Sequence, residues 1–299
     1  MIKRIFLFMM MNIAVIALIT VVFAVLEHFF GIRLDLYGFN YLSIAIYSAI
    51  IWFSWAFISL ALSKWMAKKS YWIVPINPDD VYSLWTKEQI VWNTVKELAE
   101  RNNIEMPEVG IYNSPEPNAF ATWASKNSSL VAVSTWLLEI MDKEAIEWVV
   151  GHEMAHILNW DMVTMTLLQW VLNTFVVFLA RIISNLIASR LDEWLSGIAY
   201  FLIDLLLQIL FWLLASLIAM KFSRYREFRA DEWSARFLWK EKMIAWLQAL
   251  KRMQNMAPKD EWSFATMQIS TKTKWWIMAL FSSHPDLDDR IKALEELRL

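Results

Sequence analysis

Four long apolar stretches constrain this chain more than any other feature of its sequence. Residues 5–26 and 36–63 carry no charged side chain, and the stretches at 162–188 and 195–220 carry one each. A helix needs about 20 consecutive apolar residues to cross a bilayer core of about 30 Å. We therefore predict four transmembrane helices in contact with a lipid bilayer.

Three of these stretches have alternative readings. Residues 5–26 are longer than the apolar part of a signal peptide, and no small-x-small cleavage site follows, so we expect a retained span. The last two stretches each contain an ionisable residue and could instead form a buried helical hairpin within a soluble domain.

The distribution of basic residues predicts the orientation. Lys3 and Arg4, the lysines at 64–69 and the basic residues at 221–229 fall on one side of four spans. Positive loops stay inside, so both termini and the polar segments, with any site that they form, are expected in the cytoplasm of a multi-pass inner (plasma) membrane protein. The 30 acidic residues balance 28 basic ones, so no nucleic-acid partner is expected.

The polar sequence forms two blocks separated by the second apolar pair. We predict an α+β, mostly helical protein with a small β-sheet. Its parts are an N-terminal membrane hairpin (1–69), the first half of a cytoplasmic domain (70–161), a second membrane hairpin (162–220) and the second half of the domain (221–299). Helical periodicity covers 87–102, 143–158 (with Asp142 as its N-cap) and 286–297, and β-like runs cover 109–112, 119–122 and 130–133.

A His-Glu-Met-Ala-His sequence at 152–156 carries the clearest chemical signal. On a helix, His152 and His156 face the same way and can bind one metal ion, with Glu153 placed to take a proton from water. By chance such a pattern arises on the order of a few times in a thousand chains like this one. The chain has no cysteine, so a carboxylate must complete the site. Glu227 and Asp231 share a helix face, and one can bind the metal while the other supports an imidazole.

Several motifs in order carry a family resemblance. They are H-E-M-A-H-I-L-N-x-D-M-V-T-M-T, R-E-F-x-A-D, N-A-F-A-T and S-H-P-x-L-x-x-R-I. The chain resembles the HtpX-type membrane zinc metalloproteases, relatives of the CAAX prenyl proteases with a gluzincin catalytic domain. The resemblance implies one zinc ion per chain, bound by His152, His156 and Glu227. Glu153 would be the general base and acid, and Asp231 the supporting carboxylate.

The same resemblance implies roles for further residues. The edge strand that binds an extended substrate would comprise Asn118, Ala119, Phe120, Ala121 and Thr122. His284 and Arg290 match a late motif thought to hold oxyanion-stabilising and supporting groups, although a His before Pro is more often an ordinary loop residue. Asp161 matches a family position, or only closes the zinc helix. The implied substrates are protein substrates, namely misfolded or damaged membrane proteins cleaved on the cytoplasmic side.

Two other functions stay open at this point. One is an intramembrane zinc protease, which would need the His-Glu-x-x-His helix inside a span. The other is a catalytically inactive zinc-binding membrane scaffold.

Tryptophan and glycine occur in abnormal numbers. There are 19 Trp and 5 Gly, where average usage gives about 21 Gly. Trp160 follows a helix end, which favours glycine, and Trp123 stands at a strand end where the family has glycine. Other tryptophans replace small residues of the family: Trp136, Trp170, Trp233, Trp239 and Trp246.

We hypothesise that most of these tryptophans are glycines in the natural protein, encoded by a codon that the source organism reads as Gly, whereas Trp65 and Trp92 are genuine. The alternative is enrichment of Trp at membrane interfaces.

The third and fourth apolar stretches each hold one charge, Arg181 and Asp204. Both lie at similar distances from the turn between the stretches, at roughly 10–17 Å. A charge in a bilayer usually pairs or faces water. We predict an ion pair, with separate solvation of the two groups as the alternative.

Overall fold

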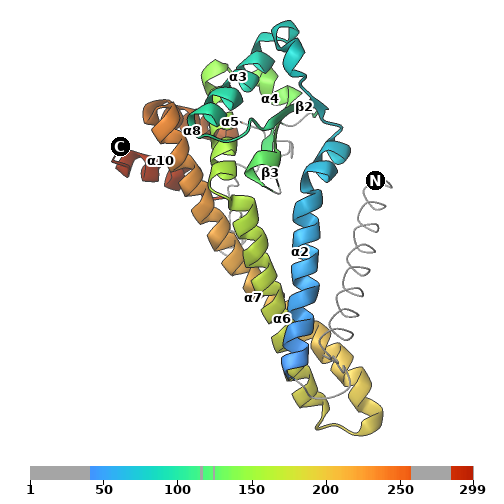
Figure 1. Ribbon diagram of the computed structural model, residues 1–299. Coiled ribbons are helices and arrows are strands. Elements are labelled where there is room, and N and C mark those ends of the chain that lie inside the picture. The colour runs from blue at the N-terminus through green and yellow to red at the C-terminus, as the bar shows by residue number, and fades with distance from the viewer. Residues whose placement is uncertain (1–40, 115–116, 124, 257–283, 299) are drawn as a thin grey trace. The chain divides into compact units, whose positions relative to one another are not determined.

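The computed structural model describes residues 41–114, 117–123, 125–256 and 284–298 (Figure 1). The chain forms two compact units. The described part of the apolar unit comprises residues 41–60 and 164–219, and that of the polar unit comprises residues 61–163 and 220–298 with the gaps just given. The predicted first span, at 5–26, lies outside the described residues.

In the described part of the chain, three helices are long and apolar enough to cross a membrane. They are α2 (Tyr41–Tyr71), α6 (Asp161–Ala188) and α7 (Glu193–Leu238), with candidate spans at Ala49–Tyr71, Asp161–Ala188 and Gly197–Leu238. These correspond to the second, third and fourth predicted stretches. Helix α7 continues for 18 residues beyond Met220, where we expected the polar block to begin, because no Gly or Pro interrupts it.

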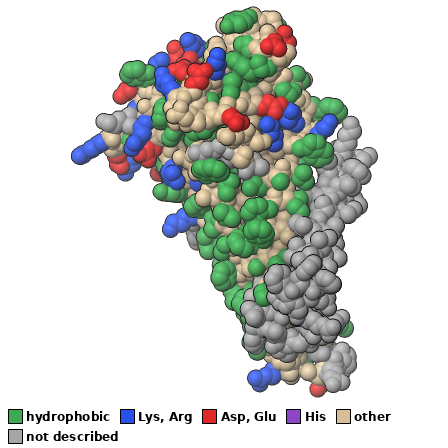
Figure 2. All heavy atoms as spheres, in the orientation of Figure 1, with side chains coloured by type: hydrophobic (Ala, Val, Ile, Leu, Met, Phe, Trp, Pro, Cys, Tyr) green, Lys and Arg blue, Asp and Glu red, His purple; other side chains and the backbone are tan. Residues whose placement is uncertain are grey.

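Apolar side chains cover the surface of the apolar unit. Phe201, Ile198 and Leu206 are more than 60% exposed, as suits contact with lipid rather than water. Figure 2 shows hydrophobic side chains gathered over these helices, whereas charged side chains gather mostly over the polar unit. Within the apolar unit, the Trp170 indole donates a 2.9 Å hydrogen bond to the Ala49 carbonyl and joins α6 to α2.

The polar unit contains a mixed four-stranded sheet. Its strands are β1 (Val74–Pro75), β2 (Glu108–Tyr112), β3 (Ala119–Trp123) and β4 (Ser129–Ser134), in the spatial order β1-β2-β4-β3. Strand β2 runs parallel to β4, while β3 is antiparallel to β4 with Ala121 opposite Val131. The three predicted strands are confirmed to within about a residue at each end. Strand β1 was missed because two residues, one of them Pro, carry no alternation.

Helices pack around this sheet. They are α3 (Thr86–Arg101), α4 (Thr135–Ile140), α5 (Lys143–Leu158), α8 (Lys240–Met256) and α10 (Leu287–Glu296), with short 3-10 helices at Pro78–Ser83 and Lys126–Ser128. The Asp142 carboxylate accepts a 2.9 Å hydrogen bond from the Ala145 amide, which confirms it as the N-cap of α5. Asp286 caps α10 in the same way by accepting from Asp288.

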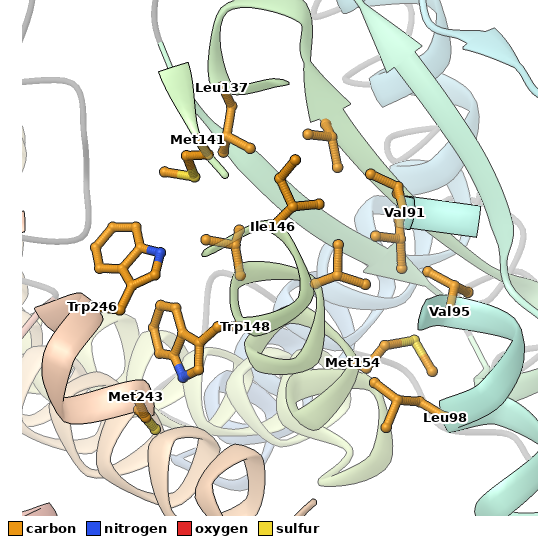
Figure 3. Packing of buried hydrophobic residues seen from close by; sticks show 14 of the residues in the cluster. Val91, Val95, Leu98, Leu137, Met141, Ile146, Trp148, Met154, Met243 and Trp246 are labelled. Carbon is orange, nitrogen blue, oxygen red and sulfur yellow. The ribbon is translucent and has the colours of Figure 1, made fainter. Parts of the chain in front are cut away.

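The core of the polar unit fixes the position of α5. Ile146 and Met154 are fully buried on this helix, against Val91, Val95 and Leu98 of α3 in one hydrophobic cluster (Figure 3). On another side of the helix the indole of Trp148 lies 5.2 Å from that of Trp246, between ring centroids. Because buried side chains around α5 hold this helix in place, the directions in which its polar side chains point are fixed as well.

Gly151 allows α7 to approach α5 closely. A Cβ atom at Gly151 would lie 2.1 Å from Leu238 Cδ1 and 2.9 Å from Ser234 Oγ, both on α7. The close approach occurs directly beside His152, so a glycine at this position lets α7 bring its carboxylates to the histidines.

Candidate metal centre

Two imidazoles and one carboxylate converge in the polar unit. His152 Nε2 and His156 Nε2, one turn apart on α5, are 3.2 Å from each other. Glu227 of α7 places Oε2 3.3 Å from His152 Nε2 and Oε1 3.5 Å from His156 Nε2. One ligand atom from each residue lies within 4.8 Å of the other two. The structure therefore brings together the three predicted ligands.

The donor set fits a zinc ion. Zinc binds imidazole nitrogen and carboxylate oxygen at about 2.0–2.2 Å in a tetrahedron, which places neighbouring ligand atoms about 3.4 Å apart. His152 Nε2 lies 3.2 Å from His156 Nε2 and 3.3 Å from Glu227 Oε2, close to that spacing, while the other carboxylate oxygen, Oε1, makes the 3.5 Å approach to His156 Nε2. Three protein ligands leave one tetrahedral position open, as catalytic zinc sites do.

Each imidazole turns its other nitrogen toward a carboxylate. His156 Nδ1 is 2.6 Å from Oδ2 of the buried Asp161, the first residue of α6. His152 Nδ1 lies 3.0 Å from Asp231 Oδ1, within ion-pair distance but without a well-oriented hydrogen bond. Such carboxylates orient ligand imidazoles and raise their basicity. The structure thus places Asp161 against a predicted ligand, and its role as a supporting carboxylate stays a prediction.

The electrostatics of the three ligands favour a cation. Burial lowers the pKa of His152, but Asp231 and Glu227 outweigh this effect and raise that pKa to about 10. Burial opposes ionisation of Glu227, yet His156, His152 and His284 hold the pKa of its carboxyl well below the usual range. The site is therefore built to hold positive charge, which a divalent cation supplies in place of protons.

The supporting carboxylate Asp231 has a buried cationic partner. Arg290 of α10 has no exposed surface and donates hydrogen bonds of 2.6 Å from Nε and from Nη2 to the two oxygens of Asp231. Burial opposes ionisation of Asp231, but Arg290 and His152 lower the pKa of its carboxyl below the usual value. The two residues are 59 positions apart, so the pair joins distant parts of the chain. A supporting role of Arg290 toward the metal centre stays a prediction.

Glu153 lies between the histidines and the sheet. Its Oε2 accepts a 2.9 Å hydrogen bond from the Ala121 amide of β3. Withdrawal from water raises the pKa of Glu153, and nearby His156 and His152 oppose that rise. A carboxyl group with a raised pKa is suited to accept and return a proton near neutral pH.

The predicted substrate strand divides between two environments. Ala119 and Ala121 pack against the main core, whereas Phe120 packs against Tyr112 with ring centroids 5.6 Å apart. Thr122 is buried, and the Asn118 amide donates to Ser134 Oγ at 2.9 Å, which anchors the start of the strand to the end of β4. Of these five residues, Ala121 is the one that the described contacts link to Glu153.

His284 lies against the ligand carboxylate. Its Nδ1 is 2.9 Å from Glu227 Oε2, and its side chain is partly buried. The structure thus brings His284 to the metal centre. It shows contact with a ligand, while a role toward an oxyanion stays a prediction.

Arg226 is a neighbour of the site that sequence reasoning missed. Its Nη1 donates to the Asp161 carbonyl at 3.3 Å, across the turn between α5 and α6. We counted Arg226 only among the basic residues that flank the fourth span. The sequence signal that could have pointed to Arg226 is its place beside Glu227 on α7.

Comparisons with known proteins agree with this geometry. The profile of Peptidase family M48 matches residues 86–298. The chain is 43% identical over 296 residues to a "Protease HtpX homolog" of Bacillus licheniformis, covering 98% of this chain and 99% of that protein. It is 48% identical over 297 residues to a "Protease HtpX homolog" of Neisseria meningitidis, covering 99% and 100%.

A solved structure shows the same fold at low identity. The crystal structure of S. mikatae Ste24p matches 98% of this chain with a TM-score of 0.64 and 15% identity. This chain spans 64% of the length of that protein. With the family profile over most of its length and full-length relatives above 40% identity, the chain belongs to peptidase family M48.

Proposed function

We propose that this protein is a membrane-bound zinc endopeptidase of the gluzincin type. One observation carries the proposal. His152, His156 and Glu227 meet at zinc-ligand spacing, with Glu153 on the same helix between the two histidines.

Each residue of the site would have a separate role in the reaction. His152, His156 and Glu227 would hold one zinc ion, which supplies Lewis-acid chemistry toward water and the scissile carbonyl. The Glu153 carboxylate accepts the proton of the attacking water at an oxygen and returns it to the leaving amine nitrogen. Asp161 and Asp231 hold the imidazoles in orientation through Nδ1.

The substrate backbone would bind along β3. This strand is the last in the sheet order, so among the described strands none pairs with its outer edge. An extended peptide adds to such an edge through main-chain hydrogen bonds. The contact between the Ala121 amide and Glu153 Oε2 supports a binding edge directly next to the general base.

The proposed substrates are misfolded or damaged membrane proteins, cleaved on the cytoplasmic side of the inner membrane. Three apolar helices in the same chain as the site support action on membrane proteins, because substrate and enzyme then share a bilayer. The basic residues that follow the second and fourth stretches support a cytoplasmic site. The metal-binding helix α5 is outside the candidate spans found among the described residues, which argues against an intramembrane protease.

The experiment compares Glu153→Gln with Glu147→Gln in the full-length protein in lipid nanodiscs. Both glutamates lie on α5, but Glu147 pairs with Lys143 at its start. Cleavage of casein and of a destabilised membrane protein should stop in Glu153→Gln, with zinc content unchanged, and should continue in Glu147→Gln.

Two outcomes would contradict the proposal. If Glu153→Gln cleaves as fast as the parent protein, Glu153 is not the general base. If the parent protein binds zinc but cleaves neither substrate, with or without added metal, the inactive scaffold is the better reading.

A further inference from the structure

Among the residues that the structure describes, four other than glycine have a left-handed backbone. They are Trp72 (φ 53°), Asn103 (φ 51°), Trp160 (φ 60°) and Trp239 (φ 78°). Positive φ is uncommon for residues with a Cβ atom, and Asn is among the few that tolerate it. Three of the four are nevertheless Trp, the residue with the largest side chain.

All four residues follow the end of a helix. Trp72 follows α2, Asn103 lies just beyond α3, Trp160 lies just beyond α5, and Trp239 separates α7 from α8. The position after the C-cap is where helices commonly end with a left-handed residue, usually Gly and sometimes Asn.

The hydrogen bonds are those of a helix-terminating Schellman motif. After α2, the Ile73 amide donates to the Lys68 carbonyl at 3.2 Å. After α3, the equivalent Ile104 amide donates to Ala99 at 3.1 Å, and after α5 the Trp160 amide donates to Ile157 at 3.3 Å. Trp72 and Trp160 therefore occupy the same structural position as Asn103, which is a residue suited to it.

None of the three indoles belongs to a hydrophobic core cluster of the described residues. Trp72 is 71% exposed, Trp239 73% and Trp160 45%, so no core packing holds these three positions in a left-handed backbone. By contrast, Trp136, Trp170, Trp233 and Trp246 lie inside helices, where backbone conformation gives no reason for glycine.

We infer that positions 72, 160 and 239 are glycines in the natural protein. The sequence hypothesis covered most of the 19 tryptophans and already named Trp160 and Trp239, and the left-handed backbone now gives an independent reason for both and for Trp72. A codon that the source organism decodes as glycine explains all three.

A glycine at position 160 would also affect the metal centre. It separates His156 from Asp161, whose side chains are 2.6 Å apart. A glycine there adopts the left-handed backbone at residue 160 without strain, and this turn leads directly into α6, whose first residue, Asp161, contacts the imidazole. The consequence for zinc rests on the proposed function, but the identity of the residue does not.

Mass spectrometry of the protein isolated from its source cells tests the inference directly. Trypsin releases residues 237–240 with Trp239 alone and residues 70–87 with Trp72 and Trp85. The expected peptides are lighter by the mass difference between Trp and Gly at positions 72, 160 and 239. Trp at these three positions would overturn the inference.

Recombinant variants provide a second measurement that does not depend on proteolytic activity. Trp72→Gly, Trp160→Gly and Trp239→Gly should each raise the Tm by about 2–4 °C, because glycine adopts positive φ without the Cβ penalty. The matched variants to Ala remove the same indole but keep a Cβ atom, and should gain less.

Trp92→Gly provides the opposite control, because Trp92 lies inside α3 against the core. It should lower the Tm. Equal effects of Gly and Ala at positions 72, 160 and 239 would show that the backbone there does not require glycine.

Discussion

Arg290 and Asp231 form a wholly buried, two-pronged ion pair between α10 and α7. The Asp231 carboxylate also faces His152, so the pair connects the last described helix to a metal ligand. Removing one partner of a buried pair typically costs about 3–5 kcal/mol, because the other charge stays buried without compensation.

Arg290→Met should therefore lower the free energy of unfolding by about 3–5 kcal/mol. The double variant Asp231→Leu with Arg290→Met should regain most of that loss while still binding zinc more weakly, since His152 has lost its carboxylate. Denaturant unfolding and zinc competition would measure the two effects.

Arg236→Met is the control, because Arg236 forms an exposed pair with Glu232. It should change the free energy of unfolding by less than about 0.5 kcal/mol. A stable Arg290→Met protein would show that the pair is not a structural requirement.

Glu227→Ala should abolish tight zinc binding. It removes one of three ligands and leaves two imidazoles, which is too few for a stable site. Elemental analysis of the purified full-length protein should give one zinc per chain for the parent and well below one for the variant. Glu232→Ala, on the same helix but half-exposed, should keep its zinc. Full retention of zinc in Glu227→Ala would exclude Glu227 as the third ligand.

Asp161→Asn should weaken zinc binding by about 10–100-fold without removing a ligand. The 2.6 Å contact orients His156 and makes its imidazole a better donor, and an amide lacks the negative charge that does this. Competition with a chromophoric chelator measures the affinity. Glu144→Gln is the control, because Glu144 is exposed in the first turn of α5, and it should leave the zinc affinity unchanged. If Asp161→Asn also leaves the affinity unchanged, Asp161 only closes the zinc helix.

Glu108 should make stability depend on pH in a defined direction. Its carboxylate lies 2.5 Å from Lys68 Nζ and 3.0 Å from Lys64 Nζ. Partial burial raises the pKa of Glu108, but the two ammonium groups outweigh burial and hold that pKa below its ordinary value. A depressed carboxyl pKa contributes stability above the unfolded-state pKa of about 4.3, and that contribution is lost as the pH falls through the folded-state pKa.

Glu108→Gln should thus cost about 0.5–1 kcal/mol at pH 7, a small value because the pair is part-exposed. The difference from the parent protein should begin to shrink as the pH falls below the unfolded-state pKa and should vanish once the pH is below the folded-state pKa of Glu108. High salt should reduce it as well. A difference that persists in acid would mean that packing, rather than charge, accounts for the effect of Glu108→Gln.

The predicted ion pair between Arg181 and Asp204 stays a prediction. The structure gives Asp204 Oδ2 a 2.6 Å hydrogen bond from Gln208 Nε2 on the same helix. If Arg181 pairs with Asp204, the charge-swapped double variant should recover stability lost in Arg181→Asp and in Asp204→Arg, with a coupling energy of about 0.5–3 kcal/mol. Thermal unfolding in nanodiscs measures the cycle, and additive effects would show that the two charges are independent.

The sequence by itself determined the features that depend on neighbours along the chain. Helix geometry places residues i and i+4 on one face, so the spacing of His152 and His156 predicted their shared direction. Run length predicted α2, α6 and α7, and short β-like runs predicted β2, β3 and β4. In each case local backbone geometry decides the outcome.

Tertiary structure decided which distant groups meet. Glu227 faces the imidazoles and Asp231 faces Arg290 because Gly151 lets α7 approach α5 beside His152, and periodicity alone left the two carboxylates equivalent. The contact of Ala121 with Glu153, and the packing of Phe120 away from it, depend on how the sheet lies against α5. Contacts across many residues follow from the packing of whole elements, which no local pattern encodes.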